Sequence, residues 1–275
     1  MKSTINDFAI PATANYVRQG SGSPVIMIHG VAASLHDWDD LIPDLTKNGY
    51  TSYALDLLGH GDSPKPNSRA YHIDWVFEHF LNWITSLCLT EPAIIIGHSL
   101  GGYIALEYAR RFSAWTRSLI LVNPFYSLSQ LPFLLRRTYR HPKLSGLIAQ
   151  GLPEWMFRMV VDFTSIGMGH NSGAVHALPE RIRAQTALDY TRTASGVYNV
   201  PNTMKDLTDI LPSISTPALI VWGERDQTLA PSSFLKMMNN MPRAEGKTIP
   251  AGHVPHQSNV REFNEMVVKF LRRLG

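Results

Sequence analysis

Five short apolar runs punctuate the chain, and each is continuous rather than alternating. They occupy residues 25–29, 53–56, 93–96, 119–122 and 218–222. Uninterrupted apolar runs of this length are typical of strands that are buried on both faces. Such strands occur mainly in parallel sheets covered by helices. The pattern therefore predicts an α/β fold with helices on both faces of the sheet.

Helical periodicity fills the segments around these runs. One apolar stripe consists of Ile73, Val76, Phe77, Phe80, Ile84 and Leu87. This spacing predicts a helix with one buried face, and Cys88 falls on the same stripe as an expected core residue. A second stripe runs over residues 260–274. Asn259 followed by Glu262 three residues later predicts a capping arrangement at the start of that second helix.

Two segments depart from the regular alternation of strands and helices. The first twenty residues predict an antiparallel edge hairpin with strands at Asn6–Ile10 and Asn15–Arg18. Residues 125–212 contain helical patterns, prolines and glycines but no buried-strand run. Because this segment is too apolar for a solvated tether, we interpret it as a helical cap or lid. The predicted core then comprises residues 1–124 and 213–275.

The composition is typical of a folded globular protein and argues against some classes of binding partner. The 275 residues are 44% hydrophobic and 17% charged, as in ordinary globular proteins. The formal charge of +3 comes without a long basic run, which argues against a nucleic-acid partner. The densest basic group lies at residues 136–143, where a solvated helix face is the simple interpretation and an anionic surface the alternative.

Targeting and metal-binding signals are missing from the sequence. Cys88 is the single cysteine, so no internal disulfide, CxxC motif or zinc-type spacing exists. We find no secretory signal and no apolar run of the ~18 residues that a membrane span needs. These features lead us to expect a cytoplasmic protein without a metal or cofactor and without a membrane span.

The strongest chemical signal is the segment Gly97–Gly102, which reads GHSLGG. It follows a predicted buried strand and precedes a predicted helix. In this GxSxG setting a sharp turn holds Ser99 in strained backbone geometry with its hydroxyl exposed above the sheet. The start of the helix also leaves the backbone N–H of Leu100 without an intrahelical partner. Ser99 is the predicted nucleophile.

A serine hydroxyl needs a base, and the base needs an orienting acid. Asp226 follows the predicted strand at residues 218–222, so it lies at the same edge of the sheet as Ser99. Glu224 is the rival acid. His253 follows a short candidate strand, Lys247–Ile249, and Gly252 is expected to permit a close approach of its loop.

His256 is the rival base, and we interpret it as a loop or capping residue. A charge-stabilising element is predicted after the first buried strand, where the N–H of Val31 joins that of Leu100 as an oxyanion hole. His29 is expected to brace this loop rather than to transfer protons. The segment Asp56–Ser63 lacks GxGxxG and a Walker lysine, so we interpret it as a structural turn.

These motifs together resemble the α/β-hydrolase superfamily over nearly the whole chain outside the insertion. The resemblance implies an eight-stranded, mostly parallel sheet with a helical cap inserted after the sixth strand. It also implies the triad Ser99, Asp226 and His253 with an oxyanion hole from Val31 and Leu100. Asn123 stands where some members carry an alternative acid, and an amide cannot replace it.

Departures from some branches of the superfamily narrow the chemistry. Members that dehalogenate alkanes or open epoxides use aspartate as the nucleophile, and this chain has Ser99 there. The loop after His29 reads His-Gly-Val-Ala rather than the His-Gly-Gly-Gly of some lipases and esterases. The resemblance therefore points to a serine hydrolase of carboxylic esters that works through an acyl-enzyme.

Apolar residues of the cap are expected to select medium-length acyl groups, although they could equally form the cap's own core. The candidate pocket residues are His29, Phe125, Phe133, Trp155, Met156 and Met159. Alternative functions are C–C bond hydrolysis, lactone hydrolysis, cofactor-free perhydrolysis of the haloperoxidase type, and small-molecule reception on the same fold. The expected partner is a small-molecule acyl substrate, and the expected oligomeric state is a monomer or a weak dimer.

Overall fold

A computed structural model describes residues 10–68, 70–132, 136, 155 and 178–274. The strands are β1 (Tyr16–Gly20), β2 (Ser23–Ile28), β3 (Tyr50–Leu55), β4 (Ala93–His98), β5 (Thr116–Val122), β6 (Ala218–Gly223) and β7 (Ala244–Ile249). The α-helices are α1 (Ile42–Lys47), α2 (Ile73–Ser86), α3 (Leu100–Arg111), α7 (Glu180–Thr191), α8 (Val200–Thr203), α9 (Pro231–Asn240), α10 (Pro255–Ser258) and α11 (Val260–Arg273). The 3-10 helices are η1 (Leu35–Trp38), η2 (Ser113–Trp115), η3 (Leu128–Gln130), η4 (Ser195–Asn199) and η5 (Thr208–Ser213).

The strands form one twisted sheet in the order β1-β3-β2-β4-β5-β6-β7. The β1–β3 pair is antiparallel, and all the other pairs are parallel. Among the described residues the sheet has seven strands instead of the predicted eight. The expected additional strand at Asn6–Ile10 falls almost entirely outside the described residues. For the same reason the insertion follows β5, the fifth strand described, and not a sixth.

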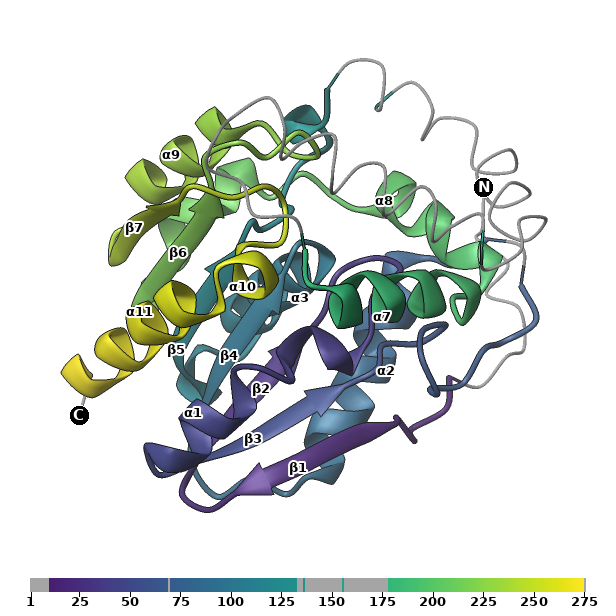
Figure 1. The fold of residues 1–275 in the computed structure, drawn as a ribbon, viewed down its shortest axis with the longest axis horizontal. Helices are drawn as coiled ribbons and strands as arrows, with labels where there is room; N and C mark the ends of the chain where they lie inside the picture. Colours follow the sequence, from purple (N-terminus) through teal and green to yellow (C-terminus); the bar gives the residue numbers. More distant parts are fainter. Residues whose placement is uncertain (1–9, 69, 133–135, 137–154, 156–177, 275) are drawn as a thin grey trace.

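Both faces of the sheet are covered, as the continuous apolar runs predicted. Within β2, Val25 and Met27 belong to one buried cluster, while Ile26 and Ile28 belong to the other. Side chains alternate between faces along a strand, so each run supplies both layers. Figure 1 shows α1 and α11 on one face and α2 and α3 on the opposite face.

Two details of the predicted helices are wrong. Cys88 is exposed and has φ +48°, because α2 ends at Ser86 and the chain turns away before it reaches Cys88. The apolar stripe therefore stops one residue short of the thiol. At the start of α11, Asn259 occupies the N-cap position but makes no side-chain capping hydrogen bond. Its Oδ1 accepts instead from the hydroxyl of Ser258.

The longest described stretch of the insertion, residues 178–212, contains several short helices and is fastened to loops of the core. The N–H of Ala194 donates to the Gly59 carbonyl at 2.8 Å, and the N–H of Tyr71 donates to the Gly196 carbonyl at 2.9 Å. Arg192 forms an ion pair with Asp62. The segment Asp56–Ser63, predicted as a structural turn, is thus also an anchor for the insertion.

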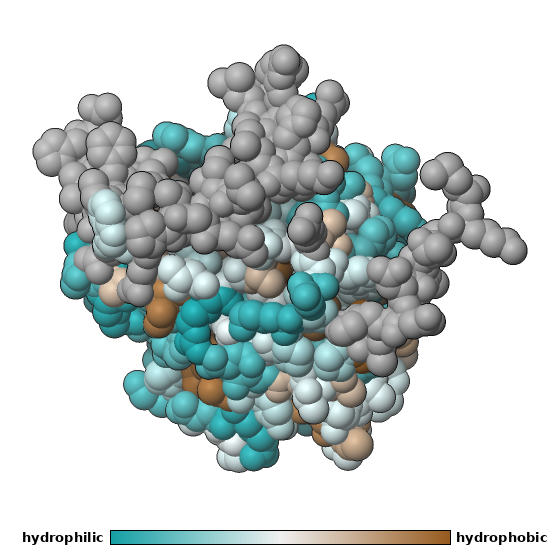
Figure 2. Space-filling model, turned by 90° about the vertical axis from the view of Figure 1, so that its right-hand side faces the viewer, coloured by the Kyte–Doolittle hydropathy of each residue, from teal (hydrophilic) through white to brown (hydrophobic). Residues whose placement is uncertain are grey.

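The described surface on one side of the molecule is mixed in hydropathy. Hydrophilic and neutral side chains predominate on the face shown in Figure 2, with hydrophobic residues scattered among them. No helix in the described part of the chain is both long and apolar enough to cross a membrane.

Candidate active site

The predicted chemical residues converge at the carboxyl edge of the parallel strands. Ser99 follows β4, Asn123 follows β5, Asp226 follows β6 and His253 follows β7. Ligand sites of open α/β sheets lie at this edge, because the loops that leave neighbouring parallel strands meet there. Ser99 and His253, which are 154 positions apart in the chain, can therefore act on one molecule.

Ser99 occupies a strained turn between β4 and α3. Its φ of +51° and ψ of −112° lie outside the regions that a residue with a side chain normally prefers. The turn is held because the Ser99 N–H donates to the Val122 carbonyl at 3.0 Å and its carbonyl accepts from the Phe125 N–H at 2.9 Å. Neighbouring strands thus fix the backbone that presents the hydroxyl.

Close packing explains the glycines around this turn. A Cβ added to Gly97 would lie 2.3 Å from the Gly101 carbonyl oxygen, and one added to Gly101 would lie 2.1 Å from the Ile28 carbonyl oxygen. Both obstacles are backbone atoms, which cannot move aside as a flexible side chain could. The GxSxG spacing therefore lets α3 start directly against β2 and β4.

The acid and the base are paired. Nδ1 of His253 and Oδ2 of Asp226 are 2.8 Å apart, and the Asp226 side chain is fully buried. Oδ1 of Asp226 accepts from the N–H groups of Thr228 and Leu229. Burial alone would raise the pKa of Asp226, but the charge and hydrogen bond of His253, with further hydrogen bonds, outweigh it and lower the pKa. Asp226 is therefore an anion at neutral pH. The rival acid Glu224 is exposed and has no such contact with His253.

The role expected of Gly252 is wrong. A Cβ on Gly252 would meet nothing within 4 Å, whereas one on Gly223 would lie 1.9 Å from the Gly252 carbonyl oxygen. The close approach exists, but it requires glycine at the end of β6 and not in the His253 loop.

Ser99 and His253 line the same cavity, of about 250 Å³. Val31, Phe125, Leu131, Leu178 and Leu229 provide most of its described apolar lining. No hydrogen bond joins Ser99 to His253 within the described residues. Hydrogen bonds between a catalytic base and its nucleophile are often long in structures without substrate. The shared cavity nevertheless allows one substrate molecule to reach both Ser99 and His253.

The predicted oxyanion donors lie beside the nucleophile. A Cβ on Gly30 would lie 3.2 Å from the Ser99 Cβ, so the loop with Val31 passes directly over the turn. Among the described residues, the N–H groups of Val31 and Leu100 have no acceptor. Leu100 is the first residue of α3, where a free N–H is expected.

The predicted pocket residues have mixed outcomes. Phe125 lines the cavity. His29 does not: it is fully buried, its Nδ1 bonds the Gly30 carbonyl at 2.7 Å and its Nε2 accepts from the Leu57 N–H at 3.0 Å. It braces the loop and is not a pocket residue. Trp155 is 62% exposed and is not part of the described lining. The other candidates, Phe133, Met156 and Met159, lie outside the described residues.

Three buried polar residues lie together near the site, and no sequence pattern predicts that they meet. Asp37, His98 and His256 form a cluster, and Asp37 and His98 also line the cavity. His256 is only 3% exposed, so its interpretation as a loop or capping residue is wrong. Burial lowers the pKa of His98 to about 4. The nearby His256 and His98 rings outweigh the opposing effect of burial on Asp37 and hold the pKa of its carboxyl well below its usual range.

Asp189 on α7 is a further acid in the cavity. Its carboxyl accepts a 2.8 Å hydrogen bond from Gln185. Burial nevertheless raises the pKa of Asp189 to about 7, and the negative charge of Asp37 contributes in the same direction. No sequence pattern marked Asp189, because a single carboxylate on a helix is normally a surface residue.

Known proteins resemble this chain along most of its length. A hydrolase of 2-hydroxy-6-oxo-6-(2'-aminophenyl)hexa-2,4-dienoic acid from Metapseudomonas resinovorans is 24% identical over 94% of this chain and 87% of its own. Lipase 3 of a Moraxella species is 26% identical over 88% of this chain and 75% of its own.

Solved structures share the fold. An esterase from Thermogutta terrifontis superposes with a TM-score of 0.77 at 20% identity, covering 95% of this chain and 93% of the esterase. An enol-lactonase from Burkholderia xenovorans gives a TM-score of 0.77 at 18% identity, over 94% and 96% of the two chains. Residues 23–259 match the family model of the alpha/beta hydrolase fold. The chain belongs to the α/β-hydrolase fold family, as its motifs indicated.

Proposed function

We propose that this protein hydrolyses carboxylic esters, with Ser99 as nucleophile, His253 as general base and acid, and Asp226 as the orienting acid. The observation that carries the proposal is the 2.8 Å contact of His253 Nδ1 with the buried Asp226 carboxylate, since His253 lines the same cavity as Ser99. Relatives named as a lipase and an esterase support the same reaction class.

The protonation pattern of His253 follows from this contact. The Asp226 carboxylate only accepts hydrogen bonds, so Nδ1 carries the proton of a neutral ring and Nε2 keeps its lone pair. Nε2 then accepts the Ser99 proton while Oγ attacks the ester carbonyl carbon. The imidazolium that forms is stabilised by Asp226 and returns the proton to the leaving alkoxide. Water repeats the sequence and releases the carboxylic acid.

Charge on the tetrahedral intermediate develops at the former carbonyl oxygen. The N–H groups of Val31 and Leu100 are the donors we assign to it. Preorganised donors of this kind contribute about 3–4 kcal/mol each when removed singly in other hydrolases. The assignment is supported by the position of both residues beside Ser99 and by the absence of other acceptors among the described residues.

The apolar lining favours a hydrocarbon acyl group over a charged one. Leu131, Leu178 and Leu229 line the cavity with Phe125, and burying each methylene contributes about 0.8 kcal/mol. We therefore propose that substrates with medium-length acyl chains react faster than acetates.

The test is a series of p-nitrophenyl esters of graded acyl length, assayed with the wild type, Ser99→Ala and the exposed control Ser213→Ala. We expect wild-type turnover that falls at least 10³-fold in Ser99→Ala and is unchanged in the control. Activity retained by a folded Ser99→Ala would contradict the nucleophile assignment. A folded wild type that is inactive on all esters would contradict ester hydrolysis and favour the hydrolysis of ring-fission diketones or lactones, perhydrolysis or ligand binding.

A further inference from the structure

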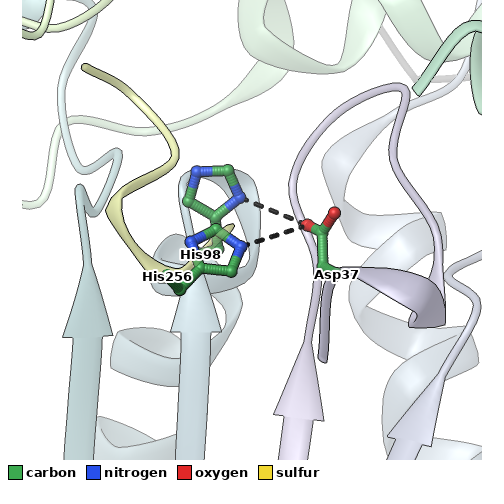
Figure 3. A group of neighbouring side chains, drawn as sticks. All are labelled: Asp37, His98 and His256. Carbon is green, nitrogen blue, oxygen red and sulfur yellow. Dashed lines mark ion pairs between the residues drawn. The ribbon is translucent and has the colours of Figure 1, made fainter. Parts of the chain in front are cut away.

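The buried cluster beneath the Ser99 turn brings together three residues that are far apart in the chain. Asp37 comes from η1, His98 from the end of β4 and His256 from α10 (Figure 3). Oδ2 of Asp37 lies 3.4 Å from Nδ1 of His98 and 3.9 Å from Nε2 of His256. The three side chains are 6%, 5% and 1% exposed, so bulk water does not separate them.

The hydrogen bonds of His98 fix which ring nitrogen carries its proton. Nε2 of His98 lies 3.0 Å from the backbone carbonyl oxygen of His253. A carbonyl oxygen only accepts, so Nε2 is the donor and Nδ1 of the neutral ring carries a lone pair. That lone pair faces Oδ2 of Asp37, which is also an acceptor. Two desolvated acceptors pointing at each other are unfavourable unless a positive charge lies between them.

Several atoms of the cluster are left without hydrogen bonds. Among the described residues, Oδ2 of Asp37, Nδ1 of His98 and both ring nitrogens of His256 are buried and unpartnered. Buried polar groups in native proteins are nearly always satisfied, so each such atom calls for an explanation. Four such atoms belong to one cluster, and one atom from each residue lies within 4.8 Å of the other two, which points to a ligand with positive charge.

We propose that Asp37, His98 and His256 bind one divalent cation of the zinc class through Oδ2, Nδ1 and Nε2. Two imidazoles and one carboxylate form a nitrogen and oxygen set suited to Zn²⁺ and its neighbours such as Co²⁺. This site is separate from the proposed ester hydrolysis and does not depend on it.

Distances in the cluster are close to those of a tetrahedral site. Bonds of about 2.0–2.1 Å place tetrahedral ligand atoms about 3.4 Å apart. The Asp37–His98 separation already has this value, and the 3.9 Å separation to His256 must shorten by roughly 0.5 Å on binding. All three ligand atoms lie within 4.8 Å of one another before any adjustment.

The surroundings orient two of the three ligands, His98 and Asp37, in the way that metal sites require. Metal-bound histidines usually donate the other ring N–H to a carbonyl or carboxylate, which is what Nε2 of His98 does. The second oxygen of Asp37 accepts a 2.9 Å hydrogen bond from Gln257, which leaves Oδ2 directed at the two rings. Asp37 and His98 border the 250 Å³ cavity, which provides an entry route and room for a water as fourth ligand.

Cobalt is the most direct probe, because tetrahedral Co²⁺ absorbs visible light and Zn²⁺ does not. Metal-stripped full-length protein would be titrated with Co²⁺, then with Zn²⁺ as a competitor. We expect one Co²⁺ per chain with visible bands that one equivalent of Zn²⁺ removes. Zn²⁺ should also raise the melting temperature, since only the folded chain holds the three ligands together.

Two variants and one control locate the metal. Asp37→Asn and His256→Gln keep the approximate size of each side chain and should weaken Co²⁺ binding at least hundredfold. His36→Gln is the matched control, because His36 is an exposed histidine that contacts Asp39 on the same short helix. Binding in this control should equal the wild type, and circular dichroism of all proteins verifies folding.

Three outcomes would overturn the proposal. Wild-type protein without stoichiometric Co²⁺ binding would mean that a shared proton, and not a metal, supplies the positive charge. Stoichiometric binding that survives in folded Asp37→Asn and His256→Gln would mean an adventitious ion elsewhere. Should both variants misfold, X-ray absorption of the cobalt-loaded wild type decides, and fewer than two imidazole ligands would contradict the site.

Discussion

The side-chain amide of Asn123 donates a 2.6 Å hydrogen bond to Oδ2 of Asp226, the oxygen that also contacts His253 Nδ1. Oδ1 of Asn123 accepts in turn from the Gly223 N–H at 3.3 Å. Asn123 is fully buried and has φ +40°, a conformation that asparagine tolerates better than most residues. Asn123 is thus a positioning residue that fixes the carboxylate facing His253.

This relationship predicts that aspartate at position 123 lowers the activity more than alanine does. Asn123→Ala removes the hydrogen bonds of the Asn123 side chain with Asp226 and Gly223 and should lower kcat/KM about tenfold. Asn123→Asp keeps the shape but sets a second carboxylate against Asp226, so one of the two must take up a proton. Ester hydrolysis at pH 7 by the aspartate variant should therefore fall at least another tenfold below that of the alanine variant. The reverse order would show that Asn123 acts only through packing.

The two glycines Gly101 and Gly252 should respond oppositely to alanine. A Cβ at Gly101 collides with the backbone of Ile28, while a Cβ at Gly252 meets nothing within 4 Å. We expect Gly101→Ala to cost about 3 kcal/mol of unfolding free energy, on the order of 10 °C in melting temperature. Gly252→Ala should melt within about 2 °C of the wild type. Equal melting temperatures would contradict the close contact of α3 with β2.

The raised pKa of Asp189 predicts that the free energy of unfolding depends on pH. Its carboxyl has a pKa of about 7 in the folded chain and about 3.9 when unfolded. Between these values the folded state keeps a proton that the unfolded state releases, so this contribution to stability is complete below pH 4 and declines as pH rises through 7. Asp189→Asn removes the titration.

The stability of Asp189→Asn relative to the wild type should therefore increase as the pH rises. In a chelator-containing buffer we expect Asp189→Asn to melt several degrees higher at pH 8, corresponding to about 2 kcal/mol or more, with the difference close to zero at pH 4. A difference that does not change with pH would mean that the Asp189 carboxyl titrates normally.

Acyl-chain preference should follow the cavity wall. Leu131 is 4% exposed and lines the cavity beside Phe125. Leu131→Ala opens space for about two further methylenes, each contributing about 0.8 kcal/mol. We expect the p-nitrophenyl ester with the highest kcat/KM to become about two carbons longer. Leu235→Ala, at an exposed residue of α9, is the control and should leave the profile unchanged. An unchanged profile in Leu131→Ala would place the acyl group elsewhere.

Local sequence was sufficient for the fold class and for the predicted triad residues. Continuous apolar runs require burial on both sides, and helical stripes between them supply the covering layers. The GxSxG turn could likewise be predicted from local sequence, because its glycines and its strained serine lie within six residues of one another. Parallel strands then place the loops of Ser99, Asp226 and His253 at one edge, so their meeting could be predicted from strand order alone.

Contacts between side chains that are far apart in the sequence could not be predicted from local pattern or strand order. Cys88 lies on a helical stripe by spacing, yet the helix ends first. The sequence indicates only that the Asn123 amide cannot serve as the alternative acid, and the folded sheet places that amide on Asp226. The partners Asp37, His98 and His256 have no metal-binding spacing in the sequence, being separated by 61 and 158 positions.

The sequence by itself thus determined the α/β-hydrolase architecture and the three residues proposed for chemistry, because both depend on local pattern and on strand direction. Tertiary structure alone decided which glycine permits the close loop approach, which carboxyl is buried enough for its pKa to reach about 7, and which imidazoles share Asp37. These properties depend on distances of a few ångströms between elements. Such distances are set by the packing of the whole core, which no short stretch of sequence contains.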